Sequence, residues 1–479
     1  MKDKKLFVKI VCFVMCFVLM FALAACTEPG DNNNDGDNTA GDNSGIEDNT
    51  GSDNTGGDNT GGDNTGSGDD GTGGNPDDDN TGDDNTGDNN GDDNTPSLPD
   101  AKDWVNVSKY NQNEVLNAYM QPIWYTREVY DETAVIVGAD GEATLLYEPN
   151  GEKIVVRNYT LGKTYVEGVD YTVEGRTIKR VKGGSLPYFK VDDYFTTSPV
   201  SLTPGGNYTI YLNPDECEFD FDEQRYIVFG ESYHLTKDHY ITISYTTDEA
   251  WDGFVPTSQT NKVSKFLNKL QNGEDVTILF YGDSITVGAN ASGSDAGGNI
   301  NPKLPTYPEL IEHYLEKKYG VEVTVLNKAV GAWKASNGVQ NFSVVTNQAA
   351  DVDLLVLAFG MNDTTTEPAT FKAQLRTMAS NFLSKNPNGS VVLVSTMLPN
   401  RQSTLVQQQP YFEQKLWELA NQDGSIAVAE VTSMFEAFES RNKRSRDWLA
   451  NNCKHPNDFG VRIYAQVILK TILGDDYGI

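Results

Sequence analysis

VTILFYGDSIT, residues 276–286, is an apolar run that ends at a glycine and continues into polar residues. Such a run predicts a buried strand. From about residue 256 onward, similar runs alternate with stretches of helical spacing, and this alternation predicts an α/β fold with a parallel sheet covered on both faces. Further strands are expected at 321–326, 354–359, 391–396 and 426–429, and helices at 307–319, 371–384, 411–421 and 460–472.

Polar residues follow three of these strands. Gly282-Asp283-Ser284 follows the first strand, a glycine-containing turn over 327–332 follows the second, and Gly360-Met361-Asn362-Asp363 follows the third. The pair His455-Pro456 precedes the last helix. Active sites in parallel sheets lie beyond the carboxyl ends of the strands, so these residues are the candidates for chemistry.

These four blocks, in this order, resemble those of the SGNH (GDSL-like) hydrolases over roughly residues 275–475. The resemblance implies a three-layer, flavodoxin-like domain and a serine carboxylester hydrolase that forms an acyl-enzyme. It implies Ser284 as nucleophile and His455 as the base that activates it. It also implies an oxyanion hole made by the Ser284 backbone, the Gly331-Ala332 turn and the Asn362 side chain.

Two positions depart from the family pattern. The second block usually has glycine where this chain has Ala332, but a backbone N–H survives that change if the dihedral angles allow it. The family usually has aspartate three residues before the histidine, where this chain has Asn452. We therefore predict a Ser–His dyad in which Asn452 orients the histidine. Asp447 and Asp458 stay open as alternatives.

Nearby residues give weaker signals. The Gly-x-Ser-x-Gly elbow of α/β-hydrolases is incomplete because Thr286 occupies its last position, which disfavours that fold. Trp333 lines the pocket or packs in the core. The loops at 290–301 and 364–366 are expected at the same sheet edge, and the first could form a pocket wall.

The N-terminus is typical of a targeting segment. A lysine-rich start precedes an almost wholly apolar run over 6–25, followed by Leu23-Ala24-Ala25-Cys26. This tetrapeptide resembles a bacterial lipoprotein box, which implies a signal peptide over 1–25 and a lipid on Cys26. The alternative is an uncleaved membrane anchor. Either way, the remainder is expected on the extracellular face of the membrane.

Residues 26–100 are expected to be a disordered linker rich in Gly, Asp, Asn and Thr, because they have few apolar side chains to bury. The stretch 31–100 holds 20 acidic residues and no Lys or Arg, about two thirds of the net charge of −32. The remaining chain is mildly acidic. We therefore expect no nucleic-acid partner, since phosphate contacts need clustered Lys and Arg.

Residues 101–255 are rich in Tyr, Val, Ile and Thr, and turn residues recur at short intervals. Strands are expected at 153–157, 208–212 and 240–245. The pattern predicts an antiparallel β-sandwich domain ahead of the hydrolase domain at 256–479. This layout is similar to that of carbohydrate esterase family two, which implies an acylated carbohydrate or another small ester as substrate.

Three functions remain open at this point. The first is an esterase that deacetylates a polysaccharide. The second is a lipid-directed esterase or acyltransferase. The third is a glycan-binding surface lipoprotein whose hydrolase domain is inactive. No cofactor is expected. No cysteine or histidine cluster indicates a metal, and Cys217 and Cys453 are too few to define a disulfide framework.

Overall fold

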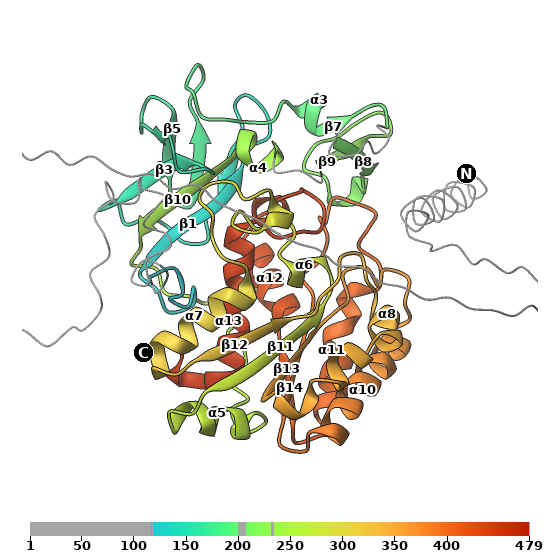
Figure 1. Cartoon of the computed structure of the whole chain (residues 1–479). Helices are drawn as coiled ribbons and strands as arrows, with labels where there is room; N and C mark the ends of the chain where they lie inside the picture. The colour runs from blue at the N-terminus through green and yellow to red at the C-terminus, as the bar shows by residue number, and fades with distance from the viewer. Residues whose placement is uncertain (1–115, 117, 200–206, 231–233, 479) are drawn as a thin grey trace, which may run out of the picture. The chain divides into compact units, whose positions relative to one another are not determined.

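The computed structural model describes residue 116 and residues 118–199, 207–230 and 234–478 (Figure 1). The predicted signal peptide, Cys26 and the linker predicted at 26–100 lie outside these residues. Among the helices of the described ranges, none is long and apolar enough to span a bilayer.

A parallel sheet of five strands forms the centre of the C-terminal half, in the order β12-β11-β13-β14-β15. The strands are β11 (Val276–Gly282), β12 (Val323–Asn327), β13 (Leu354–Ala358), β14 (Ser390–Val394) and β15 (Ile426–Ala429). β12 and β13 flank β11 on opposite sides, so the strand order reverses at β11. This is the flavodoxin-like order, and ligands of such sheets bind at the reversal point.

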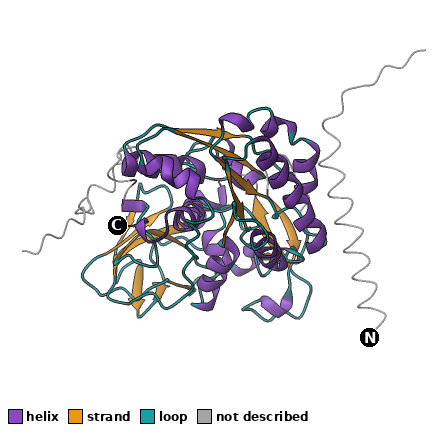
Figure 2. Cartoon of the chain, turned by 90° about the horizontal axis from the view of Figure 1, so that it is seen from below, coloured by secondary structure: helices purple, strands orange, loops and turns teal. Residues whose placement is uncertain are grey.

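Helices cover both faces of the sheet (Figures 1 and 2), and alternate side chains of its strands pack in two different core clusters. Ile278 and Phe280 of β11 lie in one core cluster, and Leu279 and Tyr281 lie in the other. The first layer comprises α5 (Ser264–Gln271), α7 (Tyr307–Tyr319), α12 (Val431–Ser440) and α13 (Asp458–Leu473). The second comprises α8 (Ala335–Gln340), α9 (Ser343–Thr346), α10 (Pro368–Lys385) and α11 (Phe412–Ala420). Strands β13, β14 and β15 are buried at every position, which explains their largely apolar sequences.

Three antiparallel sheets precede the parallel one, with the orders β1-β10-β3-β4, β2-β6-β5 and β7-β9-β8. Their strands are β1 (Glu128–Val135), β2 (Glu142–Thr144), β3 (Ile154–Asn158), β4 (Thr164–Tyr165), β5 (Tyr171–Glu174), β6 (Thr177–Arg180), β7 (Phe195–Thr196), β8 (Asn207–Tyr211), β9 (Tyr226–Gly230) and β10 (Tyr240–Thr246). The short helices are α3 (Val191–Tyr194), α4 (His234–His239) and α6 (Ser284–Val287). The predicted fold class, an α/β domain preceded by antiparallel β structure, is confirmed.

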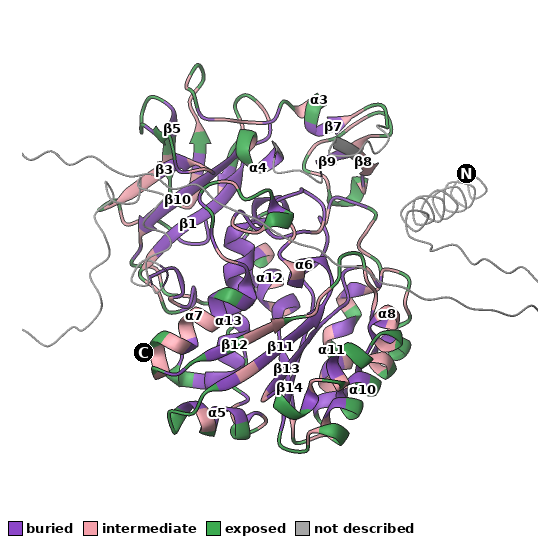
Figure 3. Cartoon of the chain, in the orientation of Figure 1, coloured by how far each residue is buried: buried purple, intermediate pink, exposed green. Residues whose placement is uncertain are grey.

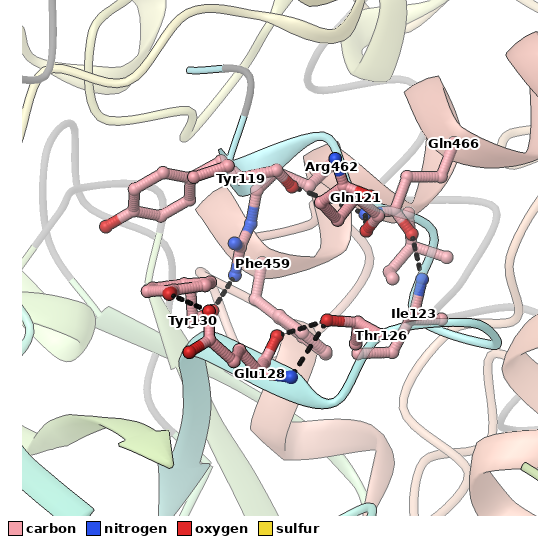
Figure 4. Close-up of a pocket in the computed structure, with 11 residues that line it drawn as sticks. Tyr119, Gln121, Ile123, Thr126, Glu128, Tyr130, Phe459, Arg462 and Gln466 are labelled. Carbon is pink, nitrogen blue, oxygen red and sulfur yellow. Dashed lines mark hydrogen bonds between the residues drawn. The ribbon is translucent and has the colours of Figure 1, made fainter. Parts of the chain in front are cut away.

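Helix α13 connects the antiparallel and parallel parts. It is buried along its whole length (Figure 3), and its apolar side chains share one core cluster with those of β10 and β11. Strand β1 and the segment before it both contact α13 (Figure 4): Arg462 Nη2 donates to the Tyr130 carbonyl at 2.5 Å, and the Ile123 N–H donates to Gln466 Oε1 at 3.0 Å. The two parts are therefore joined by a continuous core.

A buried ion pair lies at the same junction. Lys443 Nζ is 2.6 Å from Glu132 Oε1, and both side chains are fully buried. Asp447 lies 3.7 Å from the same ammonium, and Glu132 also accepts a 2.6 Å hydrogen bond from Tyr245 Oη. Removing one partner of such a pair costs about 3–5 kcal/mol, because the other charge stays buried.

The helix predicted at 307–319 is α7, with the same bounds. Helices α5 and α12 were not predicted from the sequence. The boundary predicted between residues 255 and 256 stays a prediction, and all described residues lie within one compact unit, Asn90–Ile479.

Candidate active site

Ser284 lies at the tight turn between β11 and α6. Asp283 caps this short helix, and its Oδ1 accepts the N–H of Ile285 at 3.0 Å. A Cβ at Gly282 would come 2.4 Å from the carbonyl oxygen of Ala358, so the turn requires glycine. The Gly-Asp-Ser sequence therefore presents the serine at the carboxyl end of a central strand, where the strand order reverses.

His455 precedes α13 and reaches the same point. Its Nε2 lies 2.9 Å from Ser284 Oγ, within hydrogen-bond distance. The two side chains are 8% and 7% exposed. The Ala450 N–H donates to the His455 carbonyl at 2.8 Å and fixes the backbone of the segment. The structure thus brings the predicted nucleophile and base together.

The opposite side of the imidazole contacts Asn290. Its Oδ1 lies 2.7 Å from His455 Nδ1, and Asn451 Nδ2 makes a longer contact of 3.2 Å with the same nitrogen. An amide oxygen is an acceptor, so the shorter contact requires a proton on Nδ1. This tautomer leaves a lone pair on Nε2 for the Ser284 proton, so Asn290 orients the base.

The role expected for Asn452 is corrected by this geometry. Its Oδ1 accepts from Tyr194 Oη at 2.8 Å and from Asn400 Nδ2 at 3.0 Å, and its Nδ2 donates to the Val228 carbonyl at 2.8 Å. The amide is therefore committed to hydrogen bonds away from His455. Asn452 connects the histidine segment to the antiparallel part.

Neither alternative acid reaches the histidine ring through a hydrogen bond in the described part of the chain. Asp447 Oδ1 accepts the N–H of Val135 at 2.8 Å, and Asp458 Oδ1 accepts the N–H of Ser292 at 2.8 Å. Burial raises the pKa of Asp458 to about 6. The His455 ring thus contacts Ser284 on one side and an amide on the other, and that amide is Asn290 rather than Asn452.

Sequence reasoning missed Asn290. The loop at 290–301 was expected as a pocket wall, without a role for this residue. Its backbone is left-handed, with φ 65°, a conformation that asparagine tolerates better than most residues. An asparagine near a loop glycine was the one available signal, and such a signal is common.

The environment of His455 favours the neutral ring. Burial, and then the positive charge of Lys454, lower the pKa of His455 to about 3. The imidazole is consequently unprotonated at neutral pH and can accept a proton. The same environment disfavours the imidazolium that forms once the serine has been deprotonated.

Two backbone donors at the site lack partners within the described ranges: the N–H groups of Ser284 and Ala332. Ala332 is exposed and has φ 63°, the left-handed region that favours glycine. The Val330 N–H donates to the Gly282 carbonyl at 3.1 Å, which holds the Gly331-Ala332 turn beside the end of β11. The alanine thus adopts a conformation that the family's glycine would adopt easily.

Asn362 follows β13 and carries the third expected donor. Its Nδ2 donates to the Trp333 carbonyl at 3.1 Å, and its Oδ1 accepts from Lys454 Nζ at 3.3 Å. An amide nitrogen has two hydrogens, so the second N–H of Asn362 remains for a ligand.

Two buried carboxyl groups lie beneath the site. Burial, together with the charge of Asp363, raises the pKa of Asp283 to about 7. Burial also raises the pKa of Asp363, which accepts from the Ala335 N–H at 3.1 Å and from Thr366 Oγ1 at 3.0 Å. Their hydrogen bonds fix the turns that carry Ser284 and Asn362.

Trp333 is half-buried and packs edge-on against Tyr281, with ring centroids 6.0 Å apart. This contact agrees with the core-packing alternative. Within the described residues, no group of three or more His, Cys, Asp or Glu side chains could hold a metal ion. Cys217 is half-buried and Cys453 is buried.

Comparisons with known proteins identify a family match and several similar solved structures. Residues 280–463 match the GDSL-like lipase/acylhydrolase family. No curated protein matches the chain. Similar solved structures include an acetylxylan esterase from Geobacillus stearothermophilus (19% identity, 41% of this chain and 94% of that chain, TM-score 0.33). A putative GDSL-like lipase from Parabacteroides merdae is also similar (20%, 41% and 95%, 0.34). A third is a two-domain esterase active on acetylated mannans (18%, 47% and 56%, 0.37).

The family match spans the strand ends that carry Ser284 and Asn362 and the segment that carries His455. The sheet order and the Ser–His contact lie within the same residues. Residues 280–463 therefore match the GDSL-like lipase/acylhydrolase family and contain the contact between Ser284 and His455.

Proposed function

We propose that this chain is a serine carboxylester hydrolase that removes acetyl or other small acyl groups from a polysaccharide at the cell surface. The observation that carries the proposal is the 2.9 Å contact between Ser284 Oγ and His455 Nε2, with Asn290 on the other ring nitrogen. Nucleophile, base and orienting group are the parts that acyl transfer requires.

The reaction follows from these contacts. His455 Nε2 takes the Ser284 proton while Oγ bonds to the ester carbonyl carbon, and the carbonyl oxygen becomes an oxyanion. The N–H groups of Ser284, Ala332 and Asn362 stabilise that charge. His455 then passes its proton to the leaving alcohol as the C–O bond breaks. Water, deprotonated by the same nitrogen, then attacks the acyl carbon. The bond from that carbon to Oγ breaks, His455 returns the proton to Ser284, and the acid is released.

Polar side chains surround the Ser–His pair, and this favours a hydrated substrate over a lipid. Asn290, Asn362 and Lys454 all contact groups of the centre. Gly331 and Ala332 are exposed at its edge. The sugar as the alcohol part of the ester is proposed from the resemblance in domain layout to carbohydrate esterase family two.

The glycan-binding alternative predicts that the catalytic groups serve no chemistry. The neutral His455 held against Ser284 speaks against it, because an inactive domain has no need of this alignment. A lipid-directed esterase or acyltransferase stays the second candidate through the family name alone.

The test is acetate release from a panel of acetylated polysaccharides, measured with the full chain. We expect release by wild type, a loss of at least about 1,000-fold in Ser284→Ala, and no change in the exposed control Ser384→Ala. Equal rates for wild type and Ser284→Ala would refute the esterase. Hydrolysis of long-chain p-nitrophenyl esters without acetate release would favour the hypothesis of a lipid-directed esterase.

The surface location is a separate proposal, based on the lipoprotein-like Leu23-Ala24-Ala25-Cys26. We expect metabolic labelling of the chain with radioactive palmitate, and loss of the label in Cys26→Ala. Equal labelling of both would refute lipidation at this cysteine.

A further inference from the structure

Lys454 lies between the base and the oxyanion hole. It directly precedes His455, and its half-buried side chain reaches Asn362, with Nζ 3.3 Å from Oδ1. The N–H groups of both Lys454 and His455 donate to Asn451 Oδ1, at 2.9 and 3.0 Å. The lysine backbone is thus held by the same loop that holds the histidine.

The contact with Lys454 fixes which end of the Asn362 amide faces the substrate. An ammonium group can donate but cannot accept, and a carbonyl oxygen can accept but cannot donate. Lys454 therefore selects the amide oxygen, and the Trp333 carbonyl selects the amide nitrogen. A flipped amide would place two donors together and two acceptors together, and it would present an oxygen to the oxyanion.

The distribution of charge around Ser284 and His455 also indicates a role for Lys454. The tetrahedral intermediate contains an oxyanion and an imidazolium, and a carboxylate beside the imidazolium is the usual stabilising charge. The described contacts of the His455 ring are with Ser284, Asn290 and Asn451, all uncharged. The cation of Lys454 instead contacts the oxyanion donor Asn362, on the side where negative charge develops.

We infer that Lys454 is a positioning residue of the oxyanion hole, which orients and polarises the Asn362 amide so that the second Nδ2–H binds the developing oxyanion. The inference rests on the proposed function. The imidazolium, which a carboxylate usually stabilises, has the neutral amide of Asn290 beside it. In this arrangement the charged side chain acts on the oxyanion, through Lys454 and Asn362. A fixed donor acting on such a charge in a buried site is worth a large part of the catalytic effect.

The experiment compares Lys454→Met and Lys454→Arg with the exposed control Lys385→Met, in full-length protein. The readouts are kcat and KM for p-nitrophenyl acetate, and the affinity of a trifluoromethyl ketone, which forms a tetrahedral adduct with serine. For Lys454→Met we expect kcat to fall roughly 10- to 100-fold with KM within about twofold, because the lost interaction forms in the transition state. Ketone affinity should fall in parallel. Lys454→Arg should recover part of both, and Lys385→Met should match wild type.

The outcomes separate the two proposals. An active wild type with unchanged kcat and ketone affinity in Lys454→Met would overturn the role of Lys454 and leave the esterase intact. A change in KM alone would also overturn it, since the lysine would then contribute to ground-state binding. A wild type that neither hydrolyses the ester nor binds the ketone would overturn both proposals.

Discussion

The parallel and antiparallel parts both reach the segment that carries His455, but they contribute differently. The segments that follow β11 and β13 carry Ser284 and Asn362, the proposed nucleophile and oxyanion donor. The antiparallel part supplies Tyr194 and the Val228 carbonyl, which bind Asn452. The parallel part carries the proposed catalytic residues, and the antiparallel part holds the loop that precedes His455.

Two asparagines, Asn290 and Asn452, illustrate the difference between the parallel and antiparallel parts. Asn290 and Asn452 are both buried and both left-handed, with φ 65° and 58°. Asn290 contacts the His455 ring, while Asn452 contacts the antiparallel part. The family's acid position has thus become an attachment point, and the orienting role has moved to the loop after the nucleophile. Substitutions at the two sites should therefore have separable effects.

Asn290 should show the largest effect on activity. Asn290→Ala should lower kcat about 10- to 100-fold, because the imidazole loses the acceptor that sets its tautomer. The wild-type kcat/KM should stay flat down to about pH 4, since the pKa of His455 is lowered to about 3. In Asn290→Asp, a carboxylate beside the ring should raise the pKa of His455 by roughly 1–3 units. As the pH is lowered, this variant should therefore lose activity at a higher pH than wild type does.

The matched control is Asn299→Asp, an exposed residue of the same loop with φ 49°. It adds the same charge without contacting the base, and its pH profile should equal that of wild type. Identical profiles for wild type and Asn290→Asp would show that the ring is oriented by another group.

Asn452 should affect stability more than chemistry. Asn452→Ala removes the hydrogen bonds of the side-chain amide with Tyr194, Asn400 and Val228. This loss should lower the free energy of unfolding by about 1–3 kcal/mol. The folded protein should retain kcat within roughly fivefold. Denaturant unfolding and steady-state kinetics on the same samples measure both quantities.

Asn442→Ala controls for the backbone, because Asn442 is exposed and has φ 65°. The difference between the two variants isolates the cost of the lost hydrogen bonds. If Asn452→Ala lost more activity than Asn290→Ala while equally folded, the division of roles between the two asparagines would be refuted.

Ala332→Gly should give the smallest effect. Glycine adopts the left-handed backbone of this position more easily, so stability should rise by up to about 1 kcal/mol. The N–H donor is retained, and kcat should stay within about twofold. Calorimetry and kinetics on the purified variant would measure both. A tenfold loss of activity would indicate that the Ala332 methyl group itself contacts the substrate.

The sequence was sufficient for the features that depend on local pattern. The apolar run at 276–281 predicted β11, and helical spacing predicted α7 with its bounds. Ser284 and His455 were identified because each lies in a block of recognisable composition. Within the described part of the chain, the two also meet in the structure.

The sequence was insufficient where a role depends on a distant partner. Asn290 is separated from His455 by 165 residues, and Tyr194 from Asn452 by 258. Motif spacing identifies the acid position but does not reveal that a tyrosine from helix α3 contacts it. Lys454 was missed for the same reason, because its significance depends on the position of the Asn362 amide.

The buried pair of Lys443 and Glu132 has a consequence for how this enzyme could evolve. Modular enzymes exchange accessory regions because each module folds independently. In this chain, deleting β1 would leave the Lys443 ammonium without the Glu132 carboxylate and would expose the apolar face of α13. The hydrolase domain therefore depends on the antiparallel part for its fold, and a recombinant fragment that begins at residue 256 should aggregate rather than fold.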